Sequence, residues 1–262
     1  KMVNKEAALF VPSGTMANLL AIKSQTQPAD TAILHLDSHP FNYESGGMAM
    51  VAGVMTKTLG GDYGILSPEA VQSALCQNPD HHYSPTTFVA IENTTNRGGG
   101  AIYPIETVME IGRIARENGL KTHCDGARIF NAVVESGVPI DEYATHVDTI
   151  AFCFSKGLGA PAGSILAGPQ ETIELAHRYR KMLGGGMRQA GILAAAALHA
   201  LDHHVARLKE DHRRARQFRE ALEGVHGIEI PLPSPTNIVY VQVPNAMEFI
   251  GHIGERGVLV LP

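Results

Sequence analysis

Cysteine is scarce in this sequence and shows no paired spacing. Three cysteines occur in 262 residues, at Cys76, Cys124 and Cys153. An odd number without paired spacing excludes a disulfide framework. Cys124 and Cys153 lie in apolar stretches, where we expect them to be buried like small hydrophobic side chains. This usage favours a reducing compartment, and we expect the protein to be cytoplasmic.

The sequence also lacks long apolar runs and a targeting pattern. No run approaches the ~18 apolar residues that a membrane-spanning helix needs, so we expect no membrane partner. The opening residues, KMVNKEAALF, have no signal-peptide layout and do not begin with methionine, and they look like the end of a helix whose beginning is missing. The last residues, RGVLVLP, stop just after a strand-like run. We therefore expect both ends to have been cut.

A basic surface and a metal motif are missing as well. The formal net charge is -5, and the densest basic run, residues 207–220, is interleaved with acids. This pattern is typical of a solvated helix face and predicts no nucleic-acid partner. His199 and His203 have helical spacing but lack the glutamate of a zinc-protease motif, and the glycines at 98–100 do not fit the dinucleotide pattern. We expect neither a metal nor a Rossmann cofactor.

What the sequence does contain is an alternation of strand-like and helix-like segments. Short apolar runs bounded by Gly, Asp or Pro are typical of buried parallel strands. Such runs occupy residues 31–37, 86–93, 120–126, 148–155 and 163–168. Helical patterns begin at the capping residues Ser13 and Ser67, and another follows Pro104. The alternation predicts an α/β fold with right-handed crossovers.

The pattern changes in the last third of the chain. Helical segments dominate from Pro169 to Leu222, and two strand-like runs, residues 236–243 and 257–262, then flank a short helix. We expect a large domain over residues 1–205 and part of a smaller C-terminal α/β domain over residues 206–262.

Polar side chains follow the predicted strands. In open α/β sheets, ligands bind outside the carboxyl ends of the strands. The segments that follow the strands hold His39, Tyr43, Glu92, Asn93, Asp125, Arg128 and Lys156. Scattered charges would not all fall at strand ends, so the clustering predicts a site there.

Several of these side chains have a structural and a functional interpretation. Asp125 could cap a helix that begins at Ala127, or keep the ring nitrogen of a ligand protonated. Arg128 could form a salt bridge, or grip a carboxylate through two parallel hydrogen bonds. The helix opening of Ser13, Gly14 and Thr15 could be a simple cap, or hold a phosphate.

Two further residues complete a recognisable chemistry. His39 could be structural, or stack on a planar ring in a space that Tyr43 also reaches. Lys156 ends an apolar run and precedes a glycine-rich turn, where burial would lower its pKa and let its amine form a Schiff base with a carbonyl. Phosphate cup, stacking imidazole, carboxylate and Schiff-base lysine together predict a pyridoxal phosphate site.

Six motifs carry a resemblance to a known family over nearly the whole chain: FVPSGTMANLLAI, SHPFNYESGG, ENTTNRGGG, KTHCDGARIFNA, FCFSKGLGAPAGSILAG and YRKMLGGGMRQAGILAAAALHAL. They resemble the low-specificity threonine aldolases, which are pyridoxal phosphate enzymes of the aspartate-aminotransferase-like fold (fold type I). The resemblance implies retro-aldol cleavage of threonine, allo-threonine and similar β-hydroxy-α-amino acids to glycine and an aldehyde. It also implies a dimer of dimers with sites at subunit interfaces.

The resemblance assigns roles by position. Lys156 would bond covalently to the cofactor, Asp125 would pair with its pyridine nitrogen, and His39 would stack on its ring. The other assignments are Ser13, Gly14 and Thr15 to the phosphate, Arg128 to the substrate carboxylate beside the cofactor, Tyr43 to the substrate pocket, and Arg188 to a segment near the phosphate and a subunit interface.

One motif departs from the family pattern. The family has Glu-Asn-Thr-His, whereas this chain has Glu92, Asn93, Thr94 and Thr95. In the family that histidine contacts the substrate β-hydroxyl. Thr95 would occupy the same substrate position, but a hydroxyl is no general base near pH 7, so the candidate base becomes His39 or an ordered water.

Three functions remain open on the sequence. The first is the aldolase; the second is a β-eliminating amino-acid lyase on the same fold; the third is a non-catalytic homologue that serves as an assembly subunit. Family members also begin some tens of residues earlier and continue past Pro262 to another carboxylate-binding arginine, so we expect this chain to be part of a longer protein.

Overall fold

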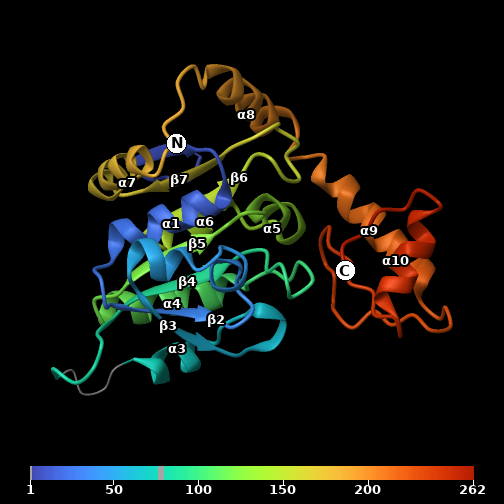
Figure 1. The fold of residues 1–262 in the computed structure, drawn as a ribbon, viewed down its shortest axis with the longest axis horizontal. Coiled ribbons are helices and arrows are strands. Elements are labelled where there is room, and N and C mark those ends of the chain that lie inside the picture. Colours follow the sequence, from blue (N-terminus) through green and yellow to red (C-terminus); the bar gives the residue numbers. More distant parts are fainter. Residues whose placement is uncertain (1, 76–79) are drawn as a thin grey trace.

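A seven-stranded sheet with helices on both faces forms the body of the protein, and the computed structural model describes residues 2–75 and 80–262 (Figure 1). In chain order the strands are β1 (Ala7–Val11), β2 (Thr31–His35), β3 (Met55–Leu59), β4 (Thr86–Glu92), β5 (Lys121–Asp125), β6 (Thr149–Cys153) and β7 (Ser164–Gly168). They lie side by side in the order β1-β7-β6-β5-β4-β2-β3. All run parallel except β7, which is antiparallel to both of its neighbours.

Helices cover both faces of this sheet. In chain order they are α1 (Gly14–Gln25), α2 (His39–Asn42), the π-helix η1 (Met48–Ala52), the 3-10 helix η2 (Asp62–Gly64), α3 (Pro68–Ala74), α4 (Ile105–Glu117), α5 (Ile129–Ser136), α6 (Ile140–Thr145), α7 (Gln170–Met182), α8 (Gly191–His203), α9 (Leu208–Leu222) and α10 (Ala246–Gly254). Helices α1 and α7 pack against each other, α4 contacts α3 and α6, and α5 contacts α6 and α9.

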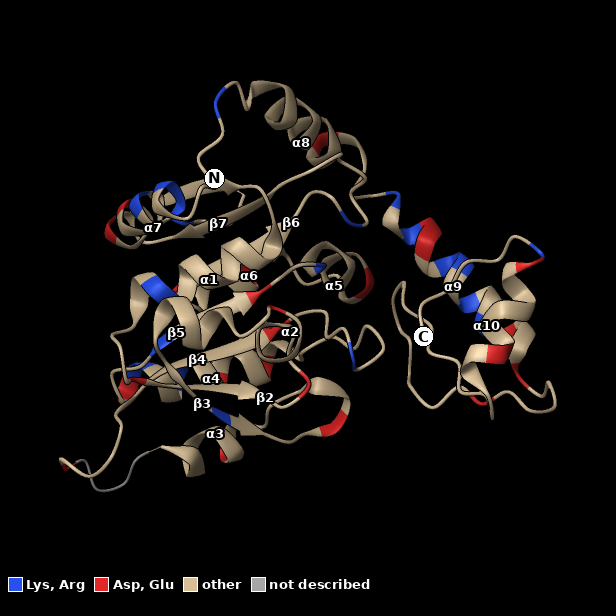
Figure 2. Ribbon diagram, viewed as in Figure 1, with Lys and Arg blue, Asp and Glu red and all other residues tan. Residues whose placement is uncertain are grey.

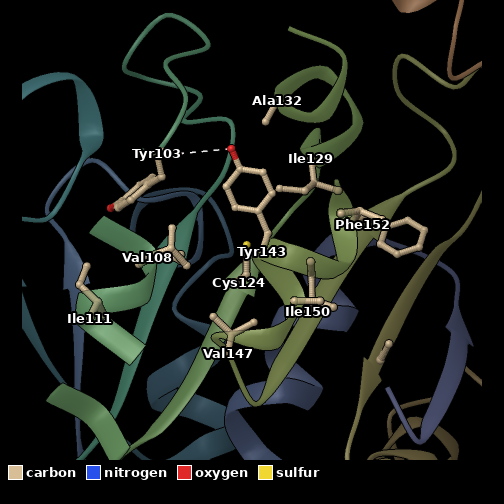
Figure 3. Packing of buried hydrophobic residues seen from close by; sticks show 14 of the residues in the cluster. Tyr103, Val108, Ile111, Cys124, Ile129, Ala132, Tyr143, Val147, Ile150 and Phe152 are labelled. Carbon is tan, nitrogen blue, oxygen red and sulfur yellow. Dashed lines mark hydrogen bonds between the residues drawn. The ribbon is translucent and has the colours of Figure 1, made fainter. Parts of the chain in front are cut away.

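The strands are buried on both faces because alternate side chains enter different cores. Along β6, Ile150 and Phe152 belong to the larger hydrophobic cluster, whereas Ala151 between them packs in the cluster beneath α1 and α7. Figure 3 shows the larger cluster, where Val108 of α4 and Tyr143 of α6 pack among residues of the sheet. This burial is why continuous apolar runs, rather than alternating ones, mark these strands in the sequence.

The predicted helix starts are confirmed. Ser13 caps α1, and its Oγ accepts a hydrogen bond from the backbone N–H of Met16 at 3.2 Å. Ser67 caps α3, and its Oγ accepts from Ala70 N–H at 3.1 Å. The helix expected after Pro104 is α4. Cys76 and the predicted end of the helix that starts at Ser67 lie outside the described residues.

One predicted strand direction is wrong. Residues 163–168 were expected to form a parallel strand, but β7 pairs antiparallel with β6. The connection between Cys153 and Ser164 contains no helix. A parallel strand would need a crossover back to the other edge of the sheet, whereas this short loop returns the chain from the edge where β6 ends.

Four other segments also differ from the prediction. The helix expected at the start is replaced by strand β1, which pairs with β7. Strand β3 was not predicted. Residues 236–243 and 257–262 form no strand and contribute only an isolated bridge between Glu229 and Gln242. A strand exists only where a partner supplies the hydrogen bonds, and local sequence does not reveal that partner.

Helices α9 and α10 are set to one side of the sheet (Figure 1), and several contacts, among them the following three, tie their part of the chain to the body. His204 Nδ1 lies 2.6 Å from the carbonyl oxygen of Leu158. Leu208 is fully buried, and a Cβ added at Gly157 would lie 3.0 Å from its Cδ2. Thr236 Oγ1 donates to the carbonyl of Gly100 at 2.9 Å. The domain boundary near residue 205 stays a prediction.

Charged residues are distributed without a basic face on α9. Figure 2 shows acidic and basic residues interspersed along this helix, and Glu210 pairs with both Arg213 and Arg214. The solvated helix face predicted for residues 207–220 is confirmed in this respect. No helix in the described part of the chain combines the length and the apolar character needed to cross a membrane.

Candidate active site

Four neighbouring parallel strands end at one edge of the sheet, and each ends in or is followed by a polar side chain. In the order β6-β5-β4-β2, Lys156 follows β6, Asp125 and Glu92 are the last residues of β5 and β4, and His39 follows β2. Carboxyl ends of parallel strands meet at the same edge, so residues far apart in the sequence become neighbours. The clustering predicted from the strand ends is therefore present in the structure.

Asp125 is the buried carboxylate of this edge, with 4% of its surface exposed. Its Oδ1 accepts a hydrogen bond from the backbone N–H of Ala127 at 3.1 Å, but helix α5 begins at Ile129 with Arg128 as its N-cap, so the prediction that Asp125 caps a helix beginning at Ala127 is wrong. Its Oδ2 accepts from Asn18 Nδ2 at 2.8 Å. No lysine or arginine within residues 2–75 and 80–262 forms an ion pair with it. Its charge therefore faces the site without a basic partner.

His39 and Glu44 form the second element of the site. His39 Nδ1 lies 3.0 Å from Glu44 Oε1, and about a third of the imidazole is exposed. The hydrogen bond to Glu44 raises the pKa of His39, with a smaller contribution in the same direction from the charge of Asp125. Burial raises the pKa of Glu44, while the bonds from His39 and Asn18 oppose that rise. The pair thus tends to keep a proton.

Tyr43 lies against the same imidazole. Its ring centroid is 5.6 Å from that of His39, and the ring planes are tilted by 45°. Tyr43 is half-exposed. Both rings therefore border one open space, as the sequence predicts.

Glu92 holds the backbone of the site. Its two carboxylate oxygens accept hydrogen bonds from the backbone N–H groups of His39 and Asn96, each at 2.8 Å. Burial, together with the nearby charge of Asp125, raises the pKa of Glu92 to about 7. Glu92 thus fixes the segment that carries His39 while adding to the negative character of the site.

Lys156 and Arg128 lie on the turns that follow β6 and β5. Lys156 is half-buried, and its turn is closed by a hydrogen bond of 2.8 Å from the backbone N–H of Gly159 to the carbonyl oxygen of Lys156. Arg128 immediately precedes α5 and is also half-buried. Neither side chain forms an ion pair with the described residues. The salt-bridge interpretation of Arg128 is therefore not supported.

The opening of α1 lies beside this edge. Gly14 packs so close to the end of β6 that a Cβ would lie 2.9 Å from Cys153 Sγ. Ser13 and Thr15 are exposed. Ser13 already caps Met16, so its capping role is shown, whereas phosphate binding by Ser13, Gly14 and Thr15 stays a prediction.

Two predicted site residues stand apart from the cluster. Thr95 is 2% exposed, and its hydroxyl donates to the carbonyl of Tyr63 at 2.8 Å rather than into an open space. Arg188 is exposed in the segment between α7 and α8 and makes no hydrogen bond to the described residues. The roles implied for both stay predictions.

Sequence reasoning missed Glu44 and Asn18. Glu44 follows Tyr43 directly and could have been found as the acid that lies five residues after His39 in the same segment. Asn18 sits inside an apolar helix pattern, and its contacts to Asp125 and His123 span more than a hundred residues. No local signal points to such contacts.

Comparison with known proteins shows the family to which the chain belongs. Residues 1–246 match the family described as Beta-eliminating lyase. The low specificity L-threonine aldolase of Escherichia coli (strain K12) is 38% identical over 262 residues, which cover 99% of this chain and 77% of that protein.

Two solved structures share the fold. The threonine aldolase of Leishmania major has a TM-score of 0.84 at 24% identity and covers 95% of this chain and 72% of its own. The aspartate aminotransferase of Thermus thermophilus has a TM-score of 0.71 at 17% identity, with 97% of this chain and 67% of its own covered. The predicted fold class, an α/β fold of the aspartate-aminotransferase type, is confirmed.

Proposed function

This chain belongs to the Beta-eliminating lyase family and, within it, to the low-specificity L-threonine aldolases, and we propose that it cleaves L-threonine and L-allo-threonine to glycine and acetaldehyde. The observation that carries the proposal is the gathering of His39, Asp125 and Lys156 at one sheet edge. A retro-aldol cleavage needs a place for the electron pair of the broken Cα–Cβ bond, a base for the β-hydroxyl proton and a grip on the carboxylate.

The acids of the site fit the cofactor of this family, pyridoxal phosphate. Glu44, Glu92 and Asp125 are all buried, yet within residues 2–75 and 80–262 His39 is the one basic side chain that bonds directly to any of them. A protonated ring nitrogen is the kind of cation that a buried carboxylate without a basic partner stabilises. Asp125 would pair with that nitrogen, and His39 would stack on the face of the ring. Lys156 would bond covalently to the cofactor. The phosphate would be bound by Ser13, Gly14, Thr15 and Arg188.

When bound, pyridoxal phosphate supplies the electron sink for carbon–carbon cleavage. The residues do the remaining work. Arg128, free of ion pairs, would bind the substrate carboxylate through its planar fork of donors. His39 with its proton at Nδ1, toward Glu44, keeps Nε2 free to accept the proton of the substrate β-hydroxyl. Tyr43 would border the substrate beside that imidazole.

The test is an assay of the purified protein with pyridoxal phosphate and L-threonine. Acetaldehyde release, followed by a coupled alcohol dehydrogenase, is expected from the wild type and from Lys121→Ala, which changes an exposed lysine at the start of β5. Lys156→Ala should abolish both acetaldehyde release and the visible absorbance of the bound cofactor, because no other amine stands at that strand end.

Other products would contradict the proposal in different ways. Pyruvate and ammonia in place of glycine would indicate a β-eliminating lyase. Cofactor absorbance without any product from amino-acid substrates would indicate a non-catalytic homologue.

We also propose that the protein is a homo-oligomer, a dimer of dimers, with sites at subunit interfaces. Helix α8 supports this because it leaves Ile192 and Leu198 81% and 61% exposed. A large apolar side chain so exposed on an apolar helix favours a covering surface. Arg188 lies in the segment just before α8, where a second copy could bring it to a phosphate.

We propose a cytoplasmic location from the cysteine usage. Cys124 and Cys153 are buried free thiols, which is typical of a reducing compartment. Cell fractionation of the tagged protein should recover it with cytosolic markers, and recovery in a secretory fraction would contradict the proposal.

A further inference from the structure

Asn18 lies beneath the site, on the buried face of α1. Only 2% of it is exposed. Its Nδ2 lies 2.8 Å from Glu44 Oε1 and 2.8 Å from Asp125 Oδ2, and its Oδ1 lies 3.1 Å from His123 Nε2. A side-chain amide has two N–H donors and a carbonyl acceptor. Both donors and the carbonyl oxygen are therefore engaged, and both donors are directed to acids of the site.

His123 fixes which way this amide points. It is fully buried in β5, its Nδ1 lies 2.9 Å from Thr149 Oγ1, and burial lowers its pKa to about 4. A neutral imidazole with its proton at Nε2 donates to Asn18 Oδ1 and accepts from the Thr149 hydroxyl. The reversed amide would place its oxygen against two carboxylates, an arrangement without a donor.

We propose that Asn18 is a positioning residue that holds the Asp125 carboxylate in place for a protonated ring nitrogen and links it to the His39–Glu44 pair. The inference rests on the proposed function, because it assigns to Asp125 the ring nitrogen of the cofactor. A buried asparagine with a purely structural role would contribute packing and hydrogen bonds, but it would not set the proton affinity of His39 or the affinity for the cofactor.

The charges around the network show why such a link matters. Glu92 faces Asp125 from β4, Glu44 and His39 face it from the segment after β2, and His123 lies two residues before it on the same strand. The charges of Lys156 and Arg128 lower the pKa of the Cys153 thiol at the neighbouring strand end, and the charge of Asp125 raises it, so all three lie near that thiol. Burial and the nearby charge of Asp125 raise the pKa of both Glu44 and Glu92, so these two carboxyl groups tend to keep a proton. A bridge of two N–H donors stabilises Glu44 and Asp125 as carboxylates at fixed separation.

Two variants test the link. Asn18→Leu keeps the branched shape of the side chain without its polar atoms, and Asn18→Ala truncates the side chain to a residue of high helix propensity, so the two variants remove the donors in different ways. Thr26→Val is the control, because it removes a buried hydroxyl bond at the end of the same helix, from Thr26 Oγ1 to the carbonyl of Ile22, without touching an acid. Circular dichroism and thermal melting would establish that each variant is folded.

Two readouts distinguish positioning from packing. The dissociation constant for pyridoxal phosphate should rise about tenfold or more in the Asn18 variants, since each loses a bond to a charged group. In cofactor-free protein, the His39 pKa measured by NMR should fall, because the pKa of Glu44 rises when it loses the amide hydrogen bond and a protonated Glu44 no longer favours the imidazolium. Thr26→Val should leave both unchanged. Asn18 variants that match Thr26→Val in both readouts would overturn the inference.

The outcome also separates this inference from the proposed function. A wild type that releases no acetaldehyde, together with Asn18 variants that weaken cofactor binding and lower the His39 pKa, would defeat the function and support the link. An active wild type with unaffected Asn18 variants would defeat the link alone.

Discussion

At the scale of single residues, the site is built on buried groups whose protonation differs from that of the same groups in water. His123 is held neutral by burial, whereas burial and the charge of Asp125 keep a proton on Glu92 at higher pH. These opposite shifts follow from one cause, because low-polarity surroundings disfavour the charged form of both acids and bases. They make folding stability depend on pH in opposite directions.

His123 gives the sharper prediction. Its pKa is about 4 in the folded protein and near 6.5 when unfolded, so the unfolded chain binds more protons between these values. The free energy of unfolding therefore falls as pH falls through this window, by about 3 kcal/mol from this residue. His123→Gln keeps a donor toward Asn18 but does not titrate.

The measurement is urea unfolding of cofactor-free wild type and His123→Gln from pH 7 to pH 4. The raised pKa of Glu92 makes the free energy of unfolding fall as pH rises, and it does so in both proteins. The difference in free energy of unfolding between the two proteins therefore reports on the His123 imidazole. Parallel pH profiles would show that His123 is not held neutral.

At the scale of elements, the sheet edge depends on how closely α1 approaches β6. A Cβ at Gly14 would lie 2.9 Å from Cys153 Sγ, and both residues stand at ends of their elements. Gly14 therefore lets the helix opening reach the strand end that leads to Lys156. Any side chain there must move one element away from the other.

Gly14→Ala should accordingly lower the free energy of unfolding by about 1–3 kcal/mol, as overpacking does, and weaken pyridoxal phosphate binding. Gly47→Ala is the matched control, because its Cβ would meet Leu19 at an ordinary 3.7 Å and its φ of −55° suits alanine. Urea unfolding and cofactor titration would measure both. If the two variants had the same free energy of unfolding and the same affinity for pyridoxal phosphate, the close approach of α1 to β6 would not be needed for stability or for binding.

The elements also show what the sequence could predict. Strands β2, β4 and β6 were found because burial on both faces gives each of them a run of apolar residues. Strand β5, Lys121–Asp125, is mostly polar, and it was found from its place between a helix and the Asp-Gly turn. Strand β3, largely exposed at the edge of the sheet, has no such mark. The direction of β7 and the lack of pairing in residues 236–243 depend on distant partners, which local composition does not encode.

The site divides in the same way. His39, Asp125, Arg128 and Lys156 were predictable because a polar residue after an apolar run is visible locally. Asn18 and the burial of Thr95 were not, because each depends on segments that meet only after folding: Asn18 on Asp125, and Thr95 on the backbone of Tyr63.

At the scale of the whole molecule, the exposed apolar side of α8 predicts assembly. Ile192→Asp and Leu198→Asp, made together, should place two charges in a covered interface and convert the oligomer to smaller species. Light scattering coupled to size-exclusion chromatography measures the mass. Met109→Asp is the control, since Met109 is also partly exposed but lies on α4 among Glu106, Glu110 and Arg113. A wild-type monomer would contradict the prediction.

The part of the chain beyond α8 braces the site from outside. His204 and Leu208 contact the turn that carries Lys156, and Thr236 holds the loop after β4 through Gly100. Substitutions of His204, Leu208 or Thr236 should therefore alter the rate of threonine cleavage, although these residues act through the two loops that they contact. Directed-evolution libraries limited to the residues at the strand ends would not sample these contacts. Libraries that include them could change the positions of both loops while every catalytic group is kept.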